Sequence, residues 1–410
     1  MAVSRSVAVE RCGVCAPEGF RASAAAAGIR GDAQRDRLDI ALIVSDHPCT
    51  AAGVFTRNLV KAAPVVISQL TLRRKAPVRA VVVNSGNANA CTGPQGFRDA
   101  LRMATAAADC CDADPSEVLV CSTGVIGRPL PMERVIAGVR GAALSLSAAA
   151  GEHAAEAIMT TDTVVKTAVA TVPIGGRVCT VGGMAKGAGM IHPDMATLLA
   201  FLTTDAAVER EALEELLTDV CSRTFNCLSI DGDTSTNDSL VLLANGAAGG
   251  PLLTAGSAEL GALRGAVEDV CTSLVEQLAA DAEGATKSIC VQVHGAEDDA
   301  QARTAARTVV LSPLVKCAVH GADPNWGRIV AALGRSGAHF ALDRCRVAIG
   351  GIDVFAAGQP VVVDLDSIRA VFRSSRIDIE VELGGGQGGG RAWGCDLSPE
   401  YVHINADYTT

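Results

Sequence analysis

The sequence predicts a mixed α/β fold with more than one lobe, and three observations support this prediction. The chain has 410 residues, which is more than one small hydrophobic core accommodates. Hydrophobic residues make up 49% of it and charged residues 20%, as is typical of a folded globular protein. Segments with the alternation of strands are interspersed with segments that have the spacing of helices. Because aromatic residues contribute only 3%, we expect Val, Leu, Ile and Ala to fill most of the core.

Several short apolar segments have the pattern of β-strands. Residues 167–181 alternate in polarity on both sides of Gly175 and Gly176, a pair that favours a tight turn, so this segment predicts a β-hairpin. Further strands are predicted at residues 80–84, 118–121, 240–243 and 361–365.

Two segments have the spacing of amphipathic helices. Residues 205–225 carry apolar residues at intervals of three and four, and Thr204 or Asp205 is expected to cap this helix. Residues 269–282 have a similar pattern and are followed by Gly284, a residue type that commonly ends helices.

The charge balance argues against nucleic acid and anionic membranes as partners. The formal net charge is −10 and the isoelectric point is about 5.2. No run of Lys or Arg interrupts this balance, so a basic surface for polyanions is not expected. No window approaches the roughly 18 consecutive apolar residues that a membrane-spanning helix needs. Residues 1–20 also lack the continuous apolar stretch of a secretory signal, and we therefore expect a cytoplasmic protein.

Fifteen cysteines are spread over the whole chain. An odd number in a long chain without a secretory signal predicts reduced, mostly buried thiols rather than a disulfide framework. Cys12 and Cys15 form a CxxC motif, but no second CxxC or paired histidines accompany it at metal-binding spacing. We expect no metal site, and chance is the simplest explanation of this motif, with a redox or zinc-binding role as the alternative.

The most unusual segment is GGMAKGAGMIHPDMATLL at residues 182–199. Its simplest interpretation is a glycine-rich turn that leads into a buried strand. A phosphate-binding loop needs Lys followed by Ser or Thr, whereas Lys186 is followed by Gly187. A third interpretation is chemical. If the peptide bond before Thr197 is cleaved, the freed α-amine, with an ordinary pKa of about 7.7–8.0, can serve as the base that activates the Thr197 hydroxyl.

Seven motifs occur in an order that resembles the glutamate N-acetyltransferase (ornithine acetyltransferase) family of arginine biosynthesis. The glycine-rich segment before Thr197 is similar to the signature of this family as well. The seven motifs are NSGNANA at 84–90, STGVIG at 122–127, MTTDT at 159–163, DGDTSTND at 231–238, EGATK at 283–287, GADPNWGR at 321–328 and YVHINADYTT at 401–410.

This resemblance implies a layered αββα sandwich like that of N-terminal-nucleophile enzymes, with a smaller C-terminal α/β region from about residue 285. It also implies self-cleavage between Ala196 and Thr197. The front chain would span residues 1–196 and the back chain residues 197–410, and two copies of each would form an α2β2 heterotetramer. Thr197 would carry the acetyl group from N2-acetylornithine to glutamate. Acetyl-CoA is a possible second donor, and no further cofactor is expected.

The resemblance also implies roles for single residues. Thr123 and Gly124 correspond to the oxyanion hole, where a hydroxyl and a backbone N–H meet the developing negative oxygen. The positions that correspond to substrate contacts are Thr163, Lys186, Thr197, Glu283, Asn405 and Thr410. The chemistry agrees, because Lys186 could hold the α-carboxylate that both substrates share. Glu283 could meet the side-chain ammonium of ornithine.

Plainer interpretations exist for most of these residues. Lys186 could be a surface lysine, Glu283 a carboxylate at a helix end, and residues 123–124 a simple turn. Residues 231–238 resemble a calcium loop, but Leu242 stands where the bidentate Glu would be, so we expect a hydrogen-bonded structural loop. We assign no catalytic role to His192, because the free amine makes a second base unnecessary.

Two other function classes compete with the transferase. One is a related hydrolase, an aminopeptidase or amidase with the same Thr197 and oxyanion hole, in which water resolves the acyl-enzyme. The other is an uncleaved binding protein that keeps the scaffold. The motifs at 159–163 and 401–410 favour the transferase over the hydrolase, whereas an intact bond between Ala196 and Thr197 in the purified protein would support the binding protein.

Overall fold

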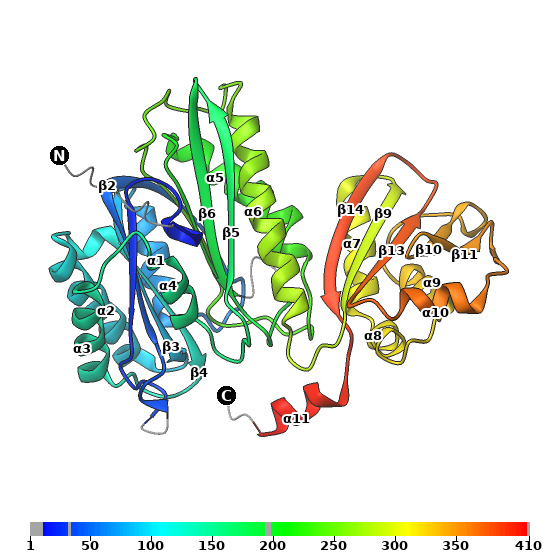
Figure 1. Ribbon diagram of the computed structural model, residues 1–410, viewed down its shortest axis with the longest axis horizontal. Helices are drawn as coiled ribbons and strands as arrows, with labels where there is room; N and C mark the ends of the chain where they lie inside the picture. The colour runs from blue at the N-terminus through cyan, green and yellow to red at the C-terminus, as the bar shows by residue number, and fades with distance from the viewer. Residues whose placement is uncertain (1–10, 32–33, 193–197, 408–410) are drawn as a thin grey trace, which may run out of the picture.

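The computed structural model describes residues 11–31, 34–192 and 198–407. Figure 1 shows a large lobe built from the first two thirds of the chain and a smaller lobe beyond it. In the large lobe, the strands follow the order β4-β3-β2-β8-β7-β6-β5, and β1 pairs with β2 outside this path. The strands are β1 (Phe20–Ala25), β2 (Ile40–Phe55), β3 (Val78–Asn87), β4 (Val118–Val125), β5 (Lys166–Ile174), β6 (Arg177–Lys186), β7 (Leu199–Thr204) and β8 (Ser239–Ala244).

The long strand β2 joins two sheet layers. Its first half pairs with β1 and β3, and its second half pairs with β8, so that residues on the two sides belong to different layers. The side-chain alternation of the strands shows the layering. On β3, Val81 and Val83 pack into a core between the layers, whereas Val82 faces helices on the outside. On β7, Phe201 faces the inner core and Leu202 faces helices on the opposite outer side.

Helices cover both outer faces. The first layer is covered by α1 (Ala63–Arg73), α2 (Gly93–Cys111) and α3 (Met132–Ala143), and the second by α5 (Arg210–Arg223) and α6 (Leu260–Ala280). The short helix α4 (Gly151–Ala157) packs into the inner core beside β1. The order helix, sheet, sheet, helix confirms the predicted αββα sandwich. Few of the inner residues are aromatic, and Val, Ala, Leu and Ile dominate the core as expected.

The smaller lobe is a second mixed α/β unit. Its six strands follow the order β12-β11-β10-β13-β9-β14, and the pair β13–β9 is parallel. These strands are β9 (Ser288–Ala296), β10 (Arg346–Ile349), β11 (Ile352–Ala356), β12 (Gln359–Pro360), β13 (Arg376–Glu382) and β14 (Gly388–Cys395). The helices are α7 (Asp299–Leu311), α8 (Pro313–His320), α9 (Trp326–Gly334) and α10 (Leu365–Val371).

The last helix, α11 (Pro399–Asp407), leaves the smaller lobe and returns toward the large one (Figure 1). Ser398 anchors its start by donating a hydrogen bond from its hydroxyl to the Gly284 carbonyl at 2.6 Å. Short 3-10 turns connect other elements, at η1 (Gly13–Cys15), η3 (Pro115–Glu117), η4 (Phe225–Cys227) and η5 (Leu342–Arg344).

Three local predictions were wrong. Helix α6 begins at Leu260, nine residues before the predicted start. Helix α5 begins at Arg210, and neither Thr204 nor Asp205 caps it, because Thr204 ends β7 and the Asp205 carboxylate accepts hydrogen bonds from the amides of Glu18 and Thr180 instead. Residues 361–364 lie outside the named strands, since only Val361 continues the β11–β12 hairpin and Asp364 then caps α10.

The cysteines and the membrane criterion give two further findings. All fifteen cysteines lie in the described ranges, and each is a free thiol there. Burial raises the pKa of the Cys15 thiol to about 12, so this half of the CxxC motif is an unreactive core residue. Within residues 11–31, 34–192 and 198–407, none of the helices combines the length and the apolar character that crossing a membrane would require.

Candidate active site

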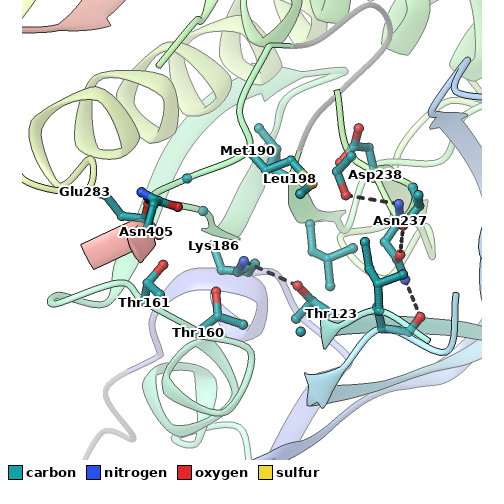
Figure 2. Close-up of a pocket in the computed structure, with 18 residues that line it drawn as sticks. Thr123, Thr160, Thr161, Lys186, Met190, Leu198, Asn237, Asp238, Glu283 and Asn405 are labelled. Atoms are coloured by element: carbon teal, nitrogen blue, oxygen red, sulfur yellow. Dashed lines mark hydrogen bonds between the residues drawn. The ribbon is translucent and has the colours of Figure 1, made fainter. Parts of the chain in front are cut away.

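A pocket lies where the ends of β4 and β6 meet the starts of β7 and β8, and α11 contributes to its rim (Figure 2). Both sides of the predicted cleavage point supply its walls. The lining residues from the front side include Ala88, Thr123, Gly124, Ile126, Thr160, Thr161, Lys186, Gly187, Gly189 and Met190. Those from the back side include Leu198, Leu199, Ser235, Thr236, Asn237, Asp238, Glu283 and Asn405.

Thr123 and Gly124 form one wall at the carboxyl end of β4. This strand runs parallel to β3, and the register of the pair shifts where Gly86 meets Gly124. Gly124 has a φ of +131°, and a Cβ placed there would lie 2.3 Å from the Gly86 carbonyl carbon. Only glycine fits this backbone, because both the dihedral angle and the close approach exclude a side chain. The adjacent Thr123 hydroxyl is thereby fixed at the pocket wall.

We expect Gly124→Ala to destabilise the protein and abolish activity at this site. The strained dihedral alone costs about 1–3 kcal/mol, and the contact with the backbone of Gly86 adds to it. Thermal and denaturant unfolding will measure the loss. Gly127→Ala is the matched control, because Gly127 also has a positive φ, +82°, but its Cβ would meet nothing within 4 Å. Equal losses in the two variants would show that the Gly86 contact is unimportant.

Lys186 is the last residue of β6 and lies almost fully buried, opposite Leu199 of β7. Its ammonium donates a hydrogen bond to the Thr123 hydroxyl at 3.4 Å. An ammonium can only donate, so the Thr123 oxygen accepts here and its own O–H remains available to donate elsewhere. Burial lowers the pKa of Lys186, and the charges of Lys166 and Arg30 lower it further. The nearby Asp162 and Glu283 carboxylates oppose this effect by raising it.

Glu283 and Asn405 form the opposite wall (Figure 2). Glu283 follows α6, and its amide donates to the Ala188 carbonyl at 2.9 Å. Asn405 reaches it from α11 and donates a hydrogen bond from Nδ2 to the carboxylate at 2.9 Å. A Cβ on Gly189 would lie 2.3 Å from the Glu283 carboxylate, so a glycine is needed at 189 for this carboxylate to occupy its place. The Lys186 cation and the Glu283 carboxylate thus lie on different walls of the pocket, and a second carboxylate, Asp238, also lines it.

Thr163 lies apart from these residues. Its side chain is exposed, and its hydroxyl and amide both donate to the Asp281 carboxylate at the end of α6. Among the described residues of the same motif, Thr160 and Thr161 line the pocket instead.

Ala196, Thr197 and Thr410 fall outside the described residues. The described chain nevertheless resumes at the pocket, because Leu198 lines its wall. The Leu198 carbonyl accepts a hydrogen bond from the Ser239 amide at 2.9 Å, and β7 begins at the next residue. The described segment that precedes the predicted cleavage point is also held in place, since the Asp231 carboxylate accepts hydrogen bonds from the amides of Met190 and Ile191 at 2.6 and 2.9 Å.

His192 is engaged with other groups. Its ring nitrogens lie 3.1 Å from the Ser229 hydroxyl and 3.1 Å from the Arg307 guanidinium. Arg307 belongs to α7, so these contacts tie the segment before the predicted cleavage point to the smaller lobe.

Two polar residues of the site were not singled out from the sequence. Asn237 donates from Nδ2 to the carbonyls of Ala88 and Ser122 at 2.6 and 2.8 Å and so holds the end of β4 next to Thr123. Asp162 is buried behind Thr160 and Lys186. Both lie inside motifs already noted, at 231–238 and 159–163, but the motif letters alone did not distinguish them from structural residues.

Comparison with known proteins gives concordant similarities. A sequence profile of the ArgJ family matches residues 21–410. An arginine biosynthesis bifunctional protein ArgJ from Symbiobacterium thermophilum is 51% identical over 398 residues, covering 97% of this chain and 98% of that protein. The crystal structure of an arginine biosynthesis bifunctional protein ArgJ from Bacillus halodurans is 41% identical, with a TM-score of 0.50. That match covers 51% of this chain and 98% of the solved one. The crystal structure of an ornithine acetyltransferase from Mycobacterium tuberculosis, complexed with ornithine, is 46% identical with a TM-score of 0.40. That match covers 45% of this chain and 96% of the solved one.

Proposed function

Because this chain belongs to the ArgJ family, we propose that it is an acetyltransferase that moves the acetyl group of N2-acetylornithine to glutamate in arginine biosynthesis. The observation that carries the proposal is the pocket in which Lys186 donates to Thr123 while Glu283 and Asn405 form the facing wall. This arrangement offers a cation for an α-carboxylate, a carboxylate for a side-chain ammonium, and a hydroxyl for an oxyanion.

The first half of the reaction forms an acetyl-enzyme. The Thr197 hydroxyl attacks the acetyl carbonyl carbon while its own α-amine takes the proton. The carbonyl oxygen becomes negative and accepts hydrogen bonds from the Thr123 O–H and the Gly124 N–H. When the amide C–N bond breaks, the protonated α-amine returns the proton to the leaving nitrogen of ornithine. The products are ornithine and an acetyl ester on Thr197.

The second half reverses these steps with glutamate. Its α-amine attacks the ester carbonyl, the same donors hold the oxyanion, and Thr197 leaves as an alcohol after regaining its proton. One amide replaces another, so the net free-energy change is small and the site serves to lower the barrier. Water must be kept from the ester, or the enzyme becomes a hydrolase. Lys186 can hold the α-carboxylate in both halves.

Self-cleavage between Ala196 and Thr197 is part of this proposal, because the α-amine exists only after the bond is broken. The Bacillus halodurans match supports it: 98% of that solved chain corresponds to only 51% of this one, so that polypeptide is about half as long. Both sides of the cleavage point line one pocket, and the two products must therefore stay associated. We further propose an α2β2 assembly in the cytoplasm.

A second donor is included in the proposal. The relatives are named bifunctional proteins, and a thioester donor would need only the same nucleophile and oxyanion hole. We propose that acetyl-CoA also acetylates Thr197 and thereby supplies new acetyl groups for glutamate.

The direct test is an acetyl-transfer assay with purified protein. We expect acetylglutamate and ornithine to form in equal amounts from N2-acetylornithine and glutamate, and expect glutamate also to be acetylated from acetyl-CoA. Mixing donor alone with enzyme should leave one acetyl group on the back chain, measured by intact mass. Acetate released without acetylglutamate would instead identify a hydrolase.

A further inference from the structure

A cluster of buried charges lies directly behind the pocket. Lys166, the first residue of β5, has a fully buried ammonium that lies 2.8 Å from the Asp162 carboxylate and 2.5 Å from the Asp281 carboxylate. Asp162 itself is buried, and its environment holds the pKa of its carboxyl at about 2, because Lys186 and Lys166 outweigh the effect of burial. A buried carboxylate this strongly stabilised stays charged throughout the working pH range.

Asp162 joins two parts of the pocket wall. One of its oxygens accepts a hydrogen bond from the Thr160 amide at 2.9 Å, in the loop that lines the pocket before β5. The other accepts from the Gly187 amide at 2.6 Å, at the end of β6 next to Lys186. The same oxygen also receives the Lys166 ammonium. Because of these three bonds, the carboxylate cannot move without shifting both the loop at Thr160 and the end of β6.

The cluster also reaches across the predicted cleavage point. Asp281, on the back side, accepts from the ammonium of Lys166 and from the amides of Thr163 and Val164 on the front side. On the same front side, the guanidinium of Arg37 donates to the Thr160 carbonyl at 2.9 Å and holds the loop from its other face. The wall that includes Thr160 is therefore fixed from several directions, and Asp162 is the member that connects it to Lys186.

We propose that Asp162 is a positioning residue for acetyl transfer: it fixes the end of β6 so that Lys186 remains a cation directed at Thr123. This inference rests on the proposed function, since it assigns a role within that reaction. The electrostatic consequence is direct. Asp162 is the strongest of the charges that oppose the effect of burial on the pKa of Lys186, and the protonated form is the one that both donates to Thr123 and attracts a carboxylate.

The charged groups around Lys186 allow two tests of the proposal, in which the pKa of Lys186 is expected to shift in opposite directions. Asp162 precedes β5 and Glu283 follows α6, and both raise its pKa, whereas Lys166 on β5 and Arg30 after β1 lower it. Removing the Asp162 charge must therefore lower the pKa of Lys186, and removing the Lys166 charge must raise it. If activity needs protonated Lys186, the alkaline limb of the pH–rate profile moves to lower pH in Asp162→Asn and to higher pH in Lys166→Gln.

The experiment measures kcat/KM for N2-acetylornithine against pH in the full-length wild type, Asp162→Asn and Lys166→Gln. We expect Asp162→Asn to lose roughly 100-fold in kcat/KM through misplacement of Lys186, with its alkaline midpoint shifted down. The midpoint is independent of the amount of active enzyme, so partial misfolding does not obscure it. If Asp162→Asn gives no folded protein, the proposal is tested by Lys166→Gln alone. An alkaline midpoint shifted to higher pH would support it, and an unshifted midpoint would contradict it.

Asp205→Asn is the matched control. Asp205 is also a buried carboxylate that accepts from two backbone amides, those of Glu18 and Thr180 at 2.9 and 2.7 Å, but it follows the far end of β7. It should keep the wild-type midpoint. Unshifted midpoints in Asp162→Asn and Lys166→Gln, with an active wild type, would overturn the positioning role while leaving the transferase intact. An inactive wild type would refute the proposed function itself.

Discussion

Thr197→Ala is expected to remain a single chain of 41.8 kDa and to have no acetyl-transfer activity, whereas the wild type splits into two fragments. The substitution removes the hydroxyl needed both to break the bond before residue 197 and to carry the acetyl group. Removing the nucleophile of a comparable acyl-transfer site lowers kcat by about a million-fold. Intact mass under denaturing conditions, followed by the transfer assay, measures both effects.

Thr197→Ser provides the control for this result, because it keeps the hydroxyl and the α-amine and removes only a methyl group. It should still split and should retain measurable transfer. Wild-type protein that stays at 41.8 kDa would mean that the Thr197 amine is never freed, and the mechanism through this amine would have to be abandoned.

Individual strands and helices of the large lobe could be predicted from the sequence because strand and helix periods are local, whereas the layered αββα order was implied only by the family resemblance. Residues 118–121 and 240–243 alternate or run apolar over a few positions, and they lie in β4 and β8 as predicted. The start of α6 was missed because Gly261 and Gly265 weaken the helical pattern in its first turns, although tertiary packing of Leu260 and Leu263 secures it. Asp205 looked like a helix cap because the sequence does not show which distant amides compete for a carboxylate.

The site divides in the same way. Thr123, Lys186, Glu283 and Asn405 are widely separated in the sequence, and only the order of whole motifs suggested that they belong together. The structure brings these four to one pocket. The role of Asp162 could not be predicted, because its partners are Gly187, 25 positions away, and Lys166, which is itself held by Asp281, 115 positions further on. Burial of such a charge depends on the assembled fold.

Thr123→Val is expected to lower kcat for acetyl transfer by about 10²–10³-fold with little change in KM. Valine has nearly the shape of threonine but no hydroxyl, so the pocket wall stays filled while one oxyanion donor disappears. The stability of the variant, measured by thermal unfolding, should be close to that of the wild type. An increase of the same size in KM, with kcat unchanged, would show that the hydroxyl binds the ground-state substrate and does not stabilise the oxyanion.

The contact between Lys186 and Thr123 predicts that substitutions at these two residues have non-additive effects on kcat. The ammonium of Lys186 donates to the Thr123 oxygen and cannot accept, so it can direct the Thr123 O–H toward the oxyanion. If it acts in this way, the two side chains contribute as a unit, and the losses in kcat from removing each of them are not additive. Lys186→Met should therefore cost less in kcat when Thr123 is already Val than it does in the wild type. Its effect on KM, through the substrate carboxylate, should be the same in both backgrounds. Additive losses in kcat would show that Lys186 works independently of the hydroxyl it touches.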